Sequence, residues 1–138
     1  MLLEKALRLA TRAHKGQIDK AGKPYIFHLI RVSERCSTEK ERIVALLHDI
    51  IEDTSVTPAN LLNEGFSQKI VDAVVSVTRN KGETYTDFIH RCRLNSIGRV
   101  VKIHDLEDNM DITRLDWITS ADVERLNKYL KAYKYLTR

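Results

Sequence analysis

Apolar residues recur along much of this chain at the three- and four-residue spacing that is typical of amphipathic helices. The first stripe predicts a helix that ends near Gly16, and its apolar members are Leu3, Ala6, Leu7, Ala10 and Ala13. Residues 16–25 are expected to form a loop because they include Gly22 and Pro24. A short helix is expected over residues 26–35. No segment alternates apolar and polar positions between turn signals, so the pattern argues against strands.

Residues that cap helix N-termini precede most of the later apolar stripes. Thr38 with Glu41 forms a capping box before a helix that we expect to carry His48 and Asp49. Another helix is expected over residues 97–110. Start signals of the same kind precede the remaining helices: Thr57 followed by a proline, Ser67, Thr84 and Ser120. The pattern therefore predicts an all-α protein that folds as a helical bundle.

Length and composition indicate one compact domain over residues 1–138. Hydrophobic residues make up 43% of the chain, while two prolines and five glycines leave little room for linkers. The apolar runs are too short to cross a bilayer, and the first residues lack the apolar core of a signal peptide. The two cysteines have no paired spacing. These features predict a reducing, cytoplasmic setting without a membrane partner.

The net charge of +4 suits a small anionic ligand. A nucleic-acid-binding protein would present a basic stripe with interleaved aromatic residues. The lysines near the C-terminus do accompany tyrosines, but Leu126, Tyr129, Leu130 and Tyr133 recur at helical spacing. That spacing favours a packed face opposite a solvated basic face, and hence no nucleic-acid partner. The sequence leaves the oligomeric state open.

The segment from Val44 to Asp53 places four polar groups in an apolar run. His48 and Asp49 are followed four residues later by Glu52 and Asp53, so on a helix all four side chains would share one patch. Buried carboxylates are costly unless a cation or hydrogen bonds compensate them. A divalent metal would provide this compensation. The alternative is a helix end that carries solvated acids.

Two further segments add possible ligands. His28 follows a proline turn among apolar residues, and Asp105 ends the apolar run that begins at Val100. Together with His48 and Asp49, they would form a mixed nitrogen and oxygen site. Such a donor set suits Mn, Fe, Zn or Co better than Ca. A five- or six-coordinate metal would leave room for water and phosphate, whereas a closed tetrahedral zinc site would be structural.

Several of these motifs occur together in the order seen in a known family. They are Ala13 to Gln17, Lys20 to His28, Ala45 to Thr54, Val101 to Asp105, and Asn109 with Met110. The chain resembles the hydrolase domain of RelA/SpoT-type alarmone enzymes, a branch of the HD phosphohydrolase superfamily that includes small free-standing members. The resemblance extends from about His14 to about Leu115.

The resemblance implies an all-helical fold and one metal ion, most simply Mn²⁺, with Fe, Co or Zn as alternatives. It also implies removal of the 3′-pyrophosphate of guanosine tetra- or pentaphosphate by an activated water. The implied metal ligands are His28, His48, Asp49 and Asp105. Glu52 and Asp53 match the catalytic acidic pair, and their spacing does not tell which is the acid and which the base.

The implied nucleotide-binding residues are Lys20 and Tyr25 in the loop, and Asn109. Lys102 could meet a phosphate or pair with nearby acids, and both readings stay open. The chain departs from the long alarmone enzymes at Asp19, where they usually have arginine, and at Leu106, where they again usually have arginine. These departures keep two alternatives open: a nucleotidase or nucleoside-triphosphate hydrolase of the same superfamily, and a non-catalytic nucleotide sensor.

Overall fold

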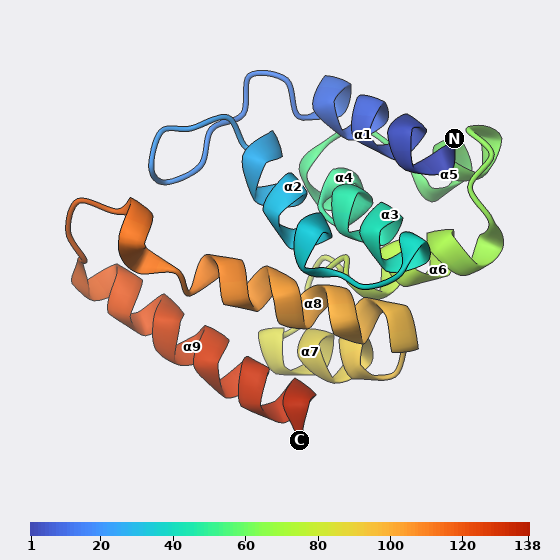
Figure 1. Ribbon diagram of the computed structural model, residues 1–138. Helices are drawn as coiled ribbons and strands as arrows, with labels where there is room; N and C mark the ends of the chain where they lie inside the picture. The colour runs from blue at the N-terminus through green and yellow to red at the C-terminus, as the bar shows by residue number, and fades with distance from the viewer.

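The computed structural model describes residues 1–138 and confirms the all-α prediction (Figure 1). The only β feature is an isolated bridge between Ile18 and Pro24, which closes the loop after the first helix. In chain order the helices are α1 (Leu2–Ala13), α2 (Ile26–Arg35), α3 (Glu39–Leu47), α4 (Ile50–Asp53), α5 (Pro58–Asn63), α6 (Gln68–Ser76), α7 (Tyr85–Arg93), α8 (Ser96–Asn109), the 3-10 turn η1 (Ile112–Arg114) and α9 (Ser120–Thr137).

The expected caps start most of these helices. Thr38 accepts a hydrogen bond from the backbone of Glu41, whose side chain reciprocates, and this capping box begins α3. At the start of α9 the expected cap, Ser120, is wrong by one residue. Thr119 has extended backbone angles and exchanges hydrogen bonds with Asp122, so Ser120 becomes the first residue of the helix.

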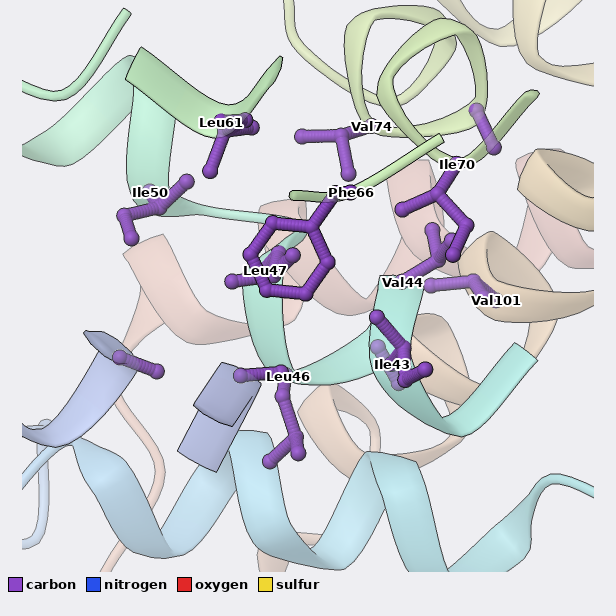
Figure 2. Close-up of a cluster of buried hydrophobic side chains, with 14 of the residues drawn as sticks. Ile43, Val44, Leu46, Leu47, Ile50, Leu61, Phe66, Ile70, Val74 and Val101 are labelled. Atoms are coloured by element: carbon purple, nitrogen blue, oxygen red, sulfur yellow. The ribbon is translucent and has the colours of Figure 1, made fainter. Parts of the chain in front are cut away.

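The largest core cluster surrounds α3, which packs against α1, α2, α6 and α8. Figure 2 shows the ring of Phe66 amid this cluster, with Leu61 and Val74 on one side and Leu46 and Ile43 on the other. Every residue of α3 from Ile43 to Leu47 is buried. Because α3 is packed on several sides, the position of its C-terminal end, next to His48, is well defined.

Helix α8 joins the two parts of the core. It contacts α2, α3 and α6 on one side and α7 and α9 on the other, as its central position in Figure 1 indicates. Gly98 lets α8 approach α6 closely, because a Cβ atom there would lie 2.1 Å from the Oγ atom of Ser76. A smaller hydrophobic cluster lies between α7, α8 and α9, and it includes Phe88, Leu106 and Leu136. None of the helices combines the length and the apolar character that crossing a bilayer requires.

Candidate metal centre

His48 and Asp49 lie at a break between two helices. The expectation of one continuous helix through this pair is wrong: α3 ends at Leu47, and α4 begins at Ile50. The imidazole Nδ1 atom of His48 lies 2.6 Å from the carbonyl oxygen of Ala45, the oxygen to which the Asp49 amide would bond in a continuous helix. At the break, the side chain and the backbone amide of His48 thus share the acceptor that the Asp49 amide would use in a continuous helix.

Both histidine rings are oriented by hydrogen bonds from their Nδ1 atoms. The carbonyl oxygen of Ala45 can only accept, so the Nδ1 atom of His48 must carry a proton. The Nδ1 atom of His28 lies 2.7 Å from a carboxylate oxygen of Asp108. In the neutral rings the Nε2 lone pairs therefore face the same point, which is the arrangement found when histidine binds a metal.

Asp105 lies at that point. Its Oδ1 atom is 2.9 Å from the Nε2 atom of His28 and 3.2 Å from the Nε2 atom of His48. Two nitrogen lone pairs and an anionic oxygen repel one another at these distances unless a cation, either protons or a metal, lies among them. Lys102 donates to the other oxygen, Oδ2, and Asn109 donates to Oδ1.

Asp49 completes the group. Donor atoms of His28, His48 and Asp49 all lie within 4.8 Å of one another. The Oδ2 atom of Asp49 is 3.2 Å from the Nε2 atom of His48, and it accepts a hydrogen bond from the Tyr25 hydroxyl. The structure thus brings together all four expected ligands. This mixed nitrogen and oxygen set fits a divalent transition metal.

The charges of the group reinforce this interpretation. Burial lowers the pKa of His28, but hydrogen bonds to Asp105 and Asp108 outweigh it and raise this pKa to about 10. Burial also acts against charge on Asp105, yet the charges of Lys102 and His48 hold the pKa of this carboxyl well below its ordinary value. The pocket therefore favours positive charge on its nitrogen atoms, whether a proton or a metal ion supplies it.

Glu52 and Asp53 follow on α4, beside Asp49, and both are open to solvent on one side. The Oε1 atom of Glu52 accepts a hydrogen bond from the backbone of Arg79, 2.9 Å away. Partial burial and the negative charges of Asp49 and Glu52 raise the pKa of Asp53 to about 6. The two acids therefore differ: one is fixed to a neighbouring loop, and the other carries a carboxyl that can hold or release a proton near neutrality.

Two cavities adjoin this group. The first, of about 340 Å³, runs along the 16–25 loop, and we name it the loop cavity. Its wall includes Lys20, Tyr25, Arg31, Asp108 and Asn109. The second, of about 200 Å³, is named the acid cavity. Its wall includes Tyr25, Asp49, Asp53, Lys102, Asp105 and Asn109. Because Tyr25 and Asn109 line both, the two cavities meet there, beside the possible metal ligands.

The expected substrate residues thus occupy different places. Tyr25, Asn109 and Lys102 contact possible metal ligands, whereas Lys20 lies farther out on the loop. The Nζ atom of Lys20 is 3.9 Å from a carboxylate oxygen of Asp122, and its side chain is 57% exposed. It is therefore free to reorient toward a ligand in the loop cavity.

Asp108 is a buried acid that the sequence analysis did not single out, although it contacts the site. It is 1% exposed and accepts hydrogen bonds from His28 and Arg31. A signal existed in the spacing: Asp108 stands three residues after Asp105, and Arg31 stands three after His28. Residues three apart share a helical face, so the pairing of Asp105 with His28 also brings Asp108 to Arg31.

The chain is similar to known proteins in sequence and in fold. Residues 6–93 match the family model described as HD domain. The guanosine-3′,5′-bis(diphosphate) 3′-pyrophosphohydrolase of Borreliella burgdorferi is 38% identical over 79 residues, which cover 54% of this chain and 12% of that protein. The protein of the same name from Haemophilus influenzae is 39% identical over 82 residues, covering 55% and 12%.

A longer match is with a probable GTP pyrophosphokinase of Mycobacterium leprae, 29% identical over 126 residues, which cover 82% of this chain and 16% of that protein. The chain thus spans less than a fifth of the length of these relatives. A solved structure of a metazoan ortholog of SpoT, described as hydrolysing ppGpp, matches with a TM-score of 0.80 at 23% identity. That match covers 99% of this chain and 85% of the other.

The structural match establishes the fold, and the family model covers well over half of the chain. The matched range contains three of the four clustered donors, His28, His48 and Asp49. Together with its all-helical architecture, this makes the chain a member of the HD domain family.

Proposed function

We propose that this protein is a metal-dependent phosphohydrolase that removes the 3′-pyrophosphate of guanosine tetra- or pentaphosphate. One observation carries the proposal. The Nε2 atoms of His28 and His48 lie 2.9 Å and 3.2 Å from the same Oδ1 atom of Asp105, in a pocket that requires a cation. The names of the relatives from Borreliella burgdorferi and Haemophilus influenzae supply the substrate class.

The proposed ligands are His28, His48, Asp49 and Asp105, and the proposed ion is Mn²⁺, with Fe, Co or Zn also suited to the donor set. A bound divalent ion neutralises phosphate charge and lowers the pKa of a water molecule. The chain's own part is to hold the donors in place. His48 is fixed by the carbonyl of Ala45.

Glu52 and Asp53 are proposed to handle protons. Both face the acid cavity beside Asp49, so a phosphate held there would be within reach of either carboxyl. One carboxylate accepts a proton from the attacking water, and one carboxylic acid returns a proton to the leaving oxygen. The hydrogen bond from the Arg79 backbone fixes Glu52 in place, which suits orienting the water; the less constrained Asp53 suits proton transfer.

The two cavities suggest how a nucleotide would bind. Lys102 and Lys128 line the acid cavity and provide positive charge for phosphate groups. The loop cavity, with Lys20 and Tyr25 on its wall, has room for the nucleoside. Asn109 lies where the cavities meet and can contact either part. A nucleotide spanning both cavities would present its 3′-pyrophosphate to the acids of α4.

A hydrolysis screen of the metal-loaded protein tests the proposal. Guanosine tetra- and pentaphosphate, GTP, GDP, ATP and nucleoside monophosphates would each be incubated with protein loaded with Mn²⁺, Fe²⁺, Co²⁺ or Zn²⁺, and products separated by ion-exchange chromatography. We expect pyrophosphate release from the guanosine 3′-pyrophosphates, and none from the Asp49→Ala variant. Faster turnover of another nucleotide would move the substrate to a different class, and binding without turnover would favour a sensor.

A further inference from the structure

Asp108 is the buried carboxylate behind His28, on the side of the ring away from Asp105. Its Oδ2 atom lies 2.7 Å from the Nδ1 atom of His28. Arg31 donates from Nε to Oδ1 over 2.8 Å and from a terminal nitrogen to Oδ2 over 3.1 Å. Arg114 adds a longer contact of 3.4 Å to Oδ2. A side chain that is 1% exposed thus receives donors on both oxygens.

These arginines decide what Asp108 can do. A buried carboxylate without partners would take up a proton, and a protonated carboxyl could donate a hydrogen bond to His28 instead of accepting one. The guanidinium groups of Arg31, Arg114 and, at 4.0 Å, Arg35 compensate the charge, so Asp108 stays an acceptor. The Nδ1 atom of His28 must then be the donor, and its Nε2 atom is left to face Asp105 and Asp49.

The two histidines differ in the group that accepts the hydrogen bond from Nδ1. His48 donates to a neutral carbonyl, that of Ala45, whereas His28 donates to a full negative charge. An anionic acceptor at Nδ1 increases the electron density at Nε2 and makes that nitrogen a stronger metal ligand. His28 also stands on α2, apart from the α3–α4 junction that carries His48 and Asp49. Its ring therefore depends on contacts from α8 for its orientation.

We propose that Asp108, clamped by Arg31 and Arg114, is a positioning residue that fixes the His28 ring as a strong metal ligand. This inference rests on the proposed metal site. The competing explanation is that Asp108 only ties α8 to α2 through Arg31 and affects stability alone. The two explanations differ in metal affinity, which a purely structural tie would leave unchanged.

The test compares metal affinity in the native protein, Asp108→Asn and Asp111→Asn. Asp111 is the matched control because it also pairs with Arg114, at 3.2 Å, and stands three residues after Asp108, beyond the end of α8. Dissociation constants for Mn²⁺ and Zn²⁺ would be measured by competition with a chromophoric chelator, and melting temperatures of the metal-free proteins recorded in parallel. We expect Asp108→Asn to weaken metal binding by about 10- to 100-fold, with Asp111→Asn within twofold of the native protein.

Equal metal affinity of Asp108→Asn and the native protein would overturn the inference, whatever happens to the melting temperature. If the native protein bound none of these metals, the proposed function itself would fail, and this outcome is distinct. A second measurement does not need the Asp108→Asn variant to fold. Long-range ¹H–¹⁵N correlation spectra of the Zn²⁺-loaded native protein should show the His28 proton on Nδ1, assigned by its loss in His28→Gln. A proton on Nε2 would overturn the inference.

Discussion

Lys102 donates a hydrogen bond from Nζ to the Oδ2 atom of Asp105, one helical turn away on α8, over 2.7 Å. Burial acts to lower the pKa of Lys102, but the charge of Asp105 outweighs it and holds this pKa above its ordinary value. The lysine is therefore a permanent cation that occupies one carboxylate oxygen and leaves the other to face the histidines. Of the two readings for Lys102, pairing with an acid is observed, and contact with a substrate phosphate stays a prediction.

The first prediction concerns metal content. Purified protein should hold about one equivalent of a transition metal, and His48→Ala or Asp49→Ala should lose it, because four ligands leave none to spare. Removal of the metal by a chelator should abolish hydrolysis. Elemental analysis by mass spectrometry measures the content. His90→Ala is the control, since His90 is exposed and contacts Tyr135 instead of the site. Full metal content in both ligand variants would contradict the assignment.

The second prediction separates the two acids of α4. Asp53→Asn should lower kcat by about two orders of magnitude, because it removes a proton-transfer group. Glu52→Gln should lower kcat less, since a glutamine oxygen can still accept the hydrogen bond from the Arg79 backbone. Both variants should keep their metal. Single-turnover kinetics with elemental analysis would check this, and a parental rate in Asp53→Asn would remove that residue from the mechanism.

The third prediction concerns Asp19, an anion on the wall of the loop cavity. Its Oδ1 atom accepts hydrogen bonds from the backbones of Ala21 and Lys23, both over 2.9 Å, so the side chain also shapes the loop. Asp19→Asn keeps an acceptor while removing the charge, and it should lower KM for guanosine tetraphosphate severalfold.

Asp19→Arg should lower this KM as well, by adding a cation that can stack on the base. The loss of the turn contacts opposes that gain, which makes the asparagine variant the cleaner test. Steady-state kinetics on all three proteins measure the effect. If KM is unchanged or higher in both variants, position 19 plays no part in specificity.

The fourth prediction tests the close approach of α8 to α6. Gly98→Ala should lower the free energy of unfolding by about 1–3 kcal/mol, because its methyl group would overlap the Oγ atom of Ser76. Ser76→Ala in the same chain removes that oxygen and should recover most of the loss. Chemical denaturation of the two variants and the double variant would check this. A double variant as unstable as Gly98→Ala would contradict the packing explanation.

The fifth prediction concerns pH. Hydrogen bonds from Arg91 and from the Asn80 backbone lower the pKa of Glu83 from 4.5 to about 2. The carboxylate therefore contributes its full stabilisation above pH 4.5, and this is lost as the pH falls through 2. Glu83→Gln should lower the melting temperature by several degrees at pH 7, with a difference that shrinks toward pH 2. Glu64→Gln, which breaks an exposed pair with Lys5, should change little at any pH.

Local chemistry made much of this structure predictable from the sequence. The caps at Thr38 and Thr84 are satisfied by residues three positions later, so helix starts follow from short-range spacing. The proposed metal donors were recognisable because His28, His48 and Asp105 each interrupt or end an apolar run, where an uncompensated polar group is costly. The structure brings these donors together, although they stand on three different helices or helix ends.

Features that depend on tertiary contacts were not predictable. The break after Leu47 has no glycine or proline to announce it, and it coincides with the bond between the His48 ring and the carbonyl of Ala45. The spacing places Asp108 on the same face of α8 as Asp105, but its burial and its hydrogen bonds with His28 and Arg31 arise only when α8 packs against α2. Both depend on where a side chain points in the folded chain, which periodicity does not encode.

The step between α3 and α4 has an evolutionary consequence. His48 is buried and follows five consecutive buried residues of α3, Ile43–Leu47, so substitutions of His48 disturb the core. Asp49 opens a helix of four residues, and the acids Glu52 and Asp53 on it are open to solvent. Because these side chains are exposed, substitutions of Glu52 or Asp53 are expected to affect the proposed chemistry more than the stability of the bundle. The junction thus separates positions that core packing constrains from positions that can vary in evolution without unfolding the bundle.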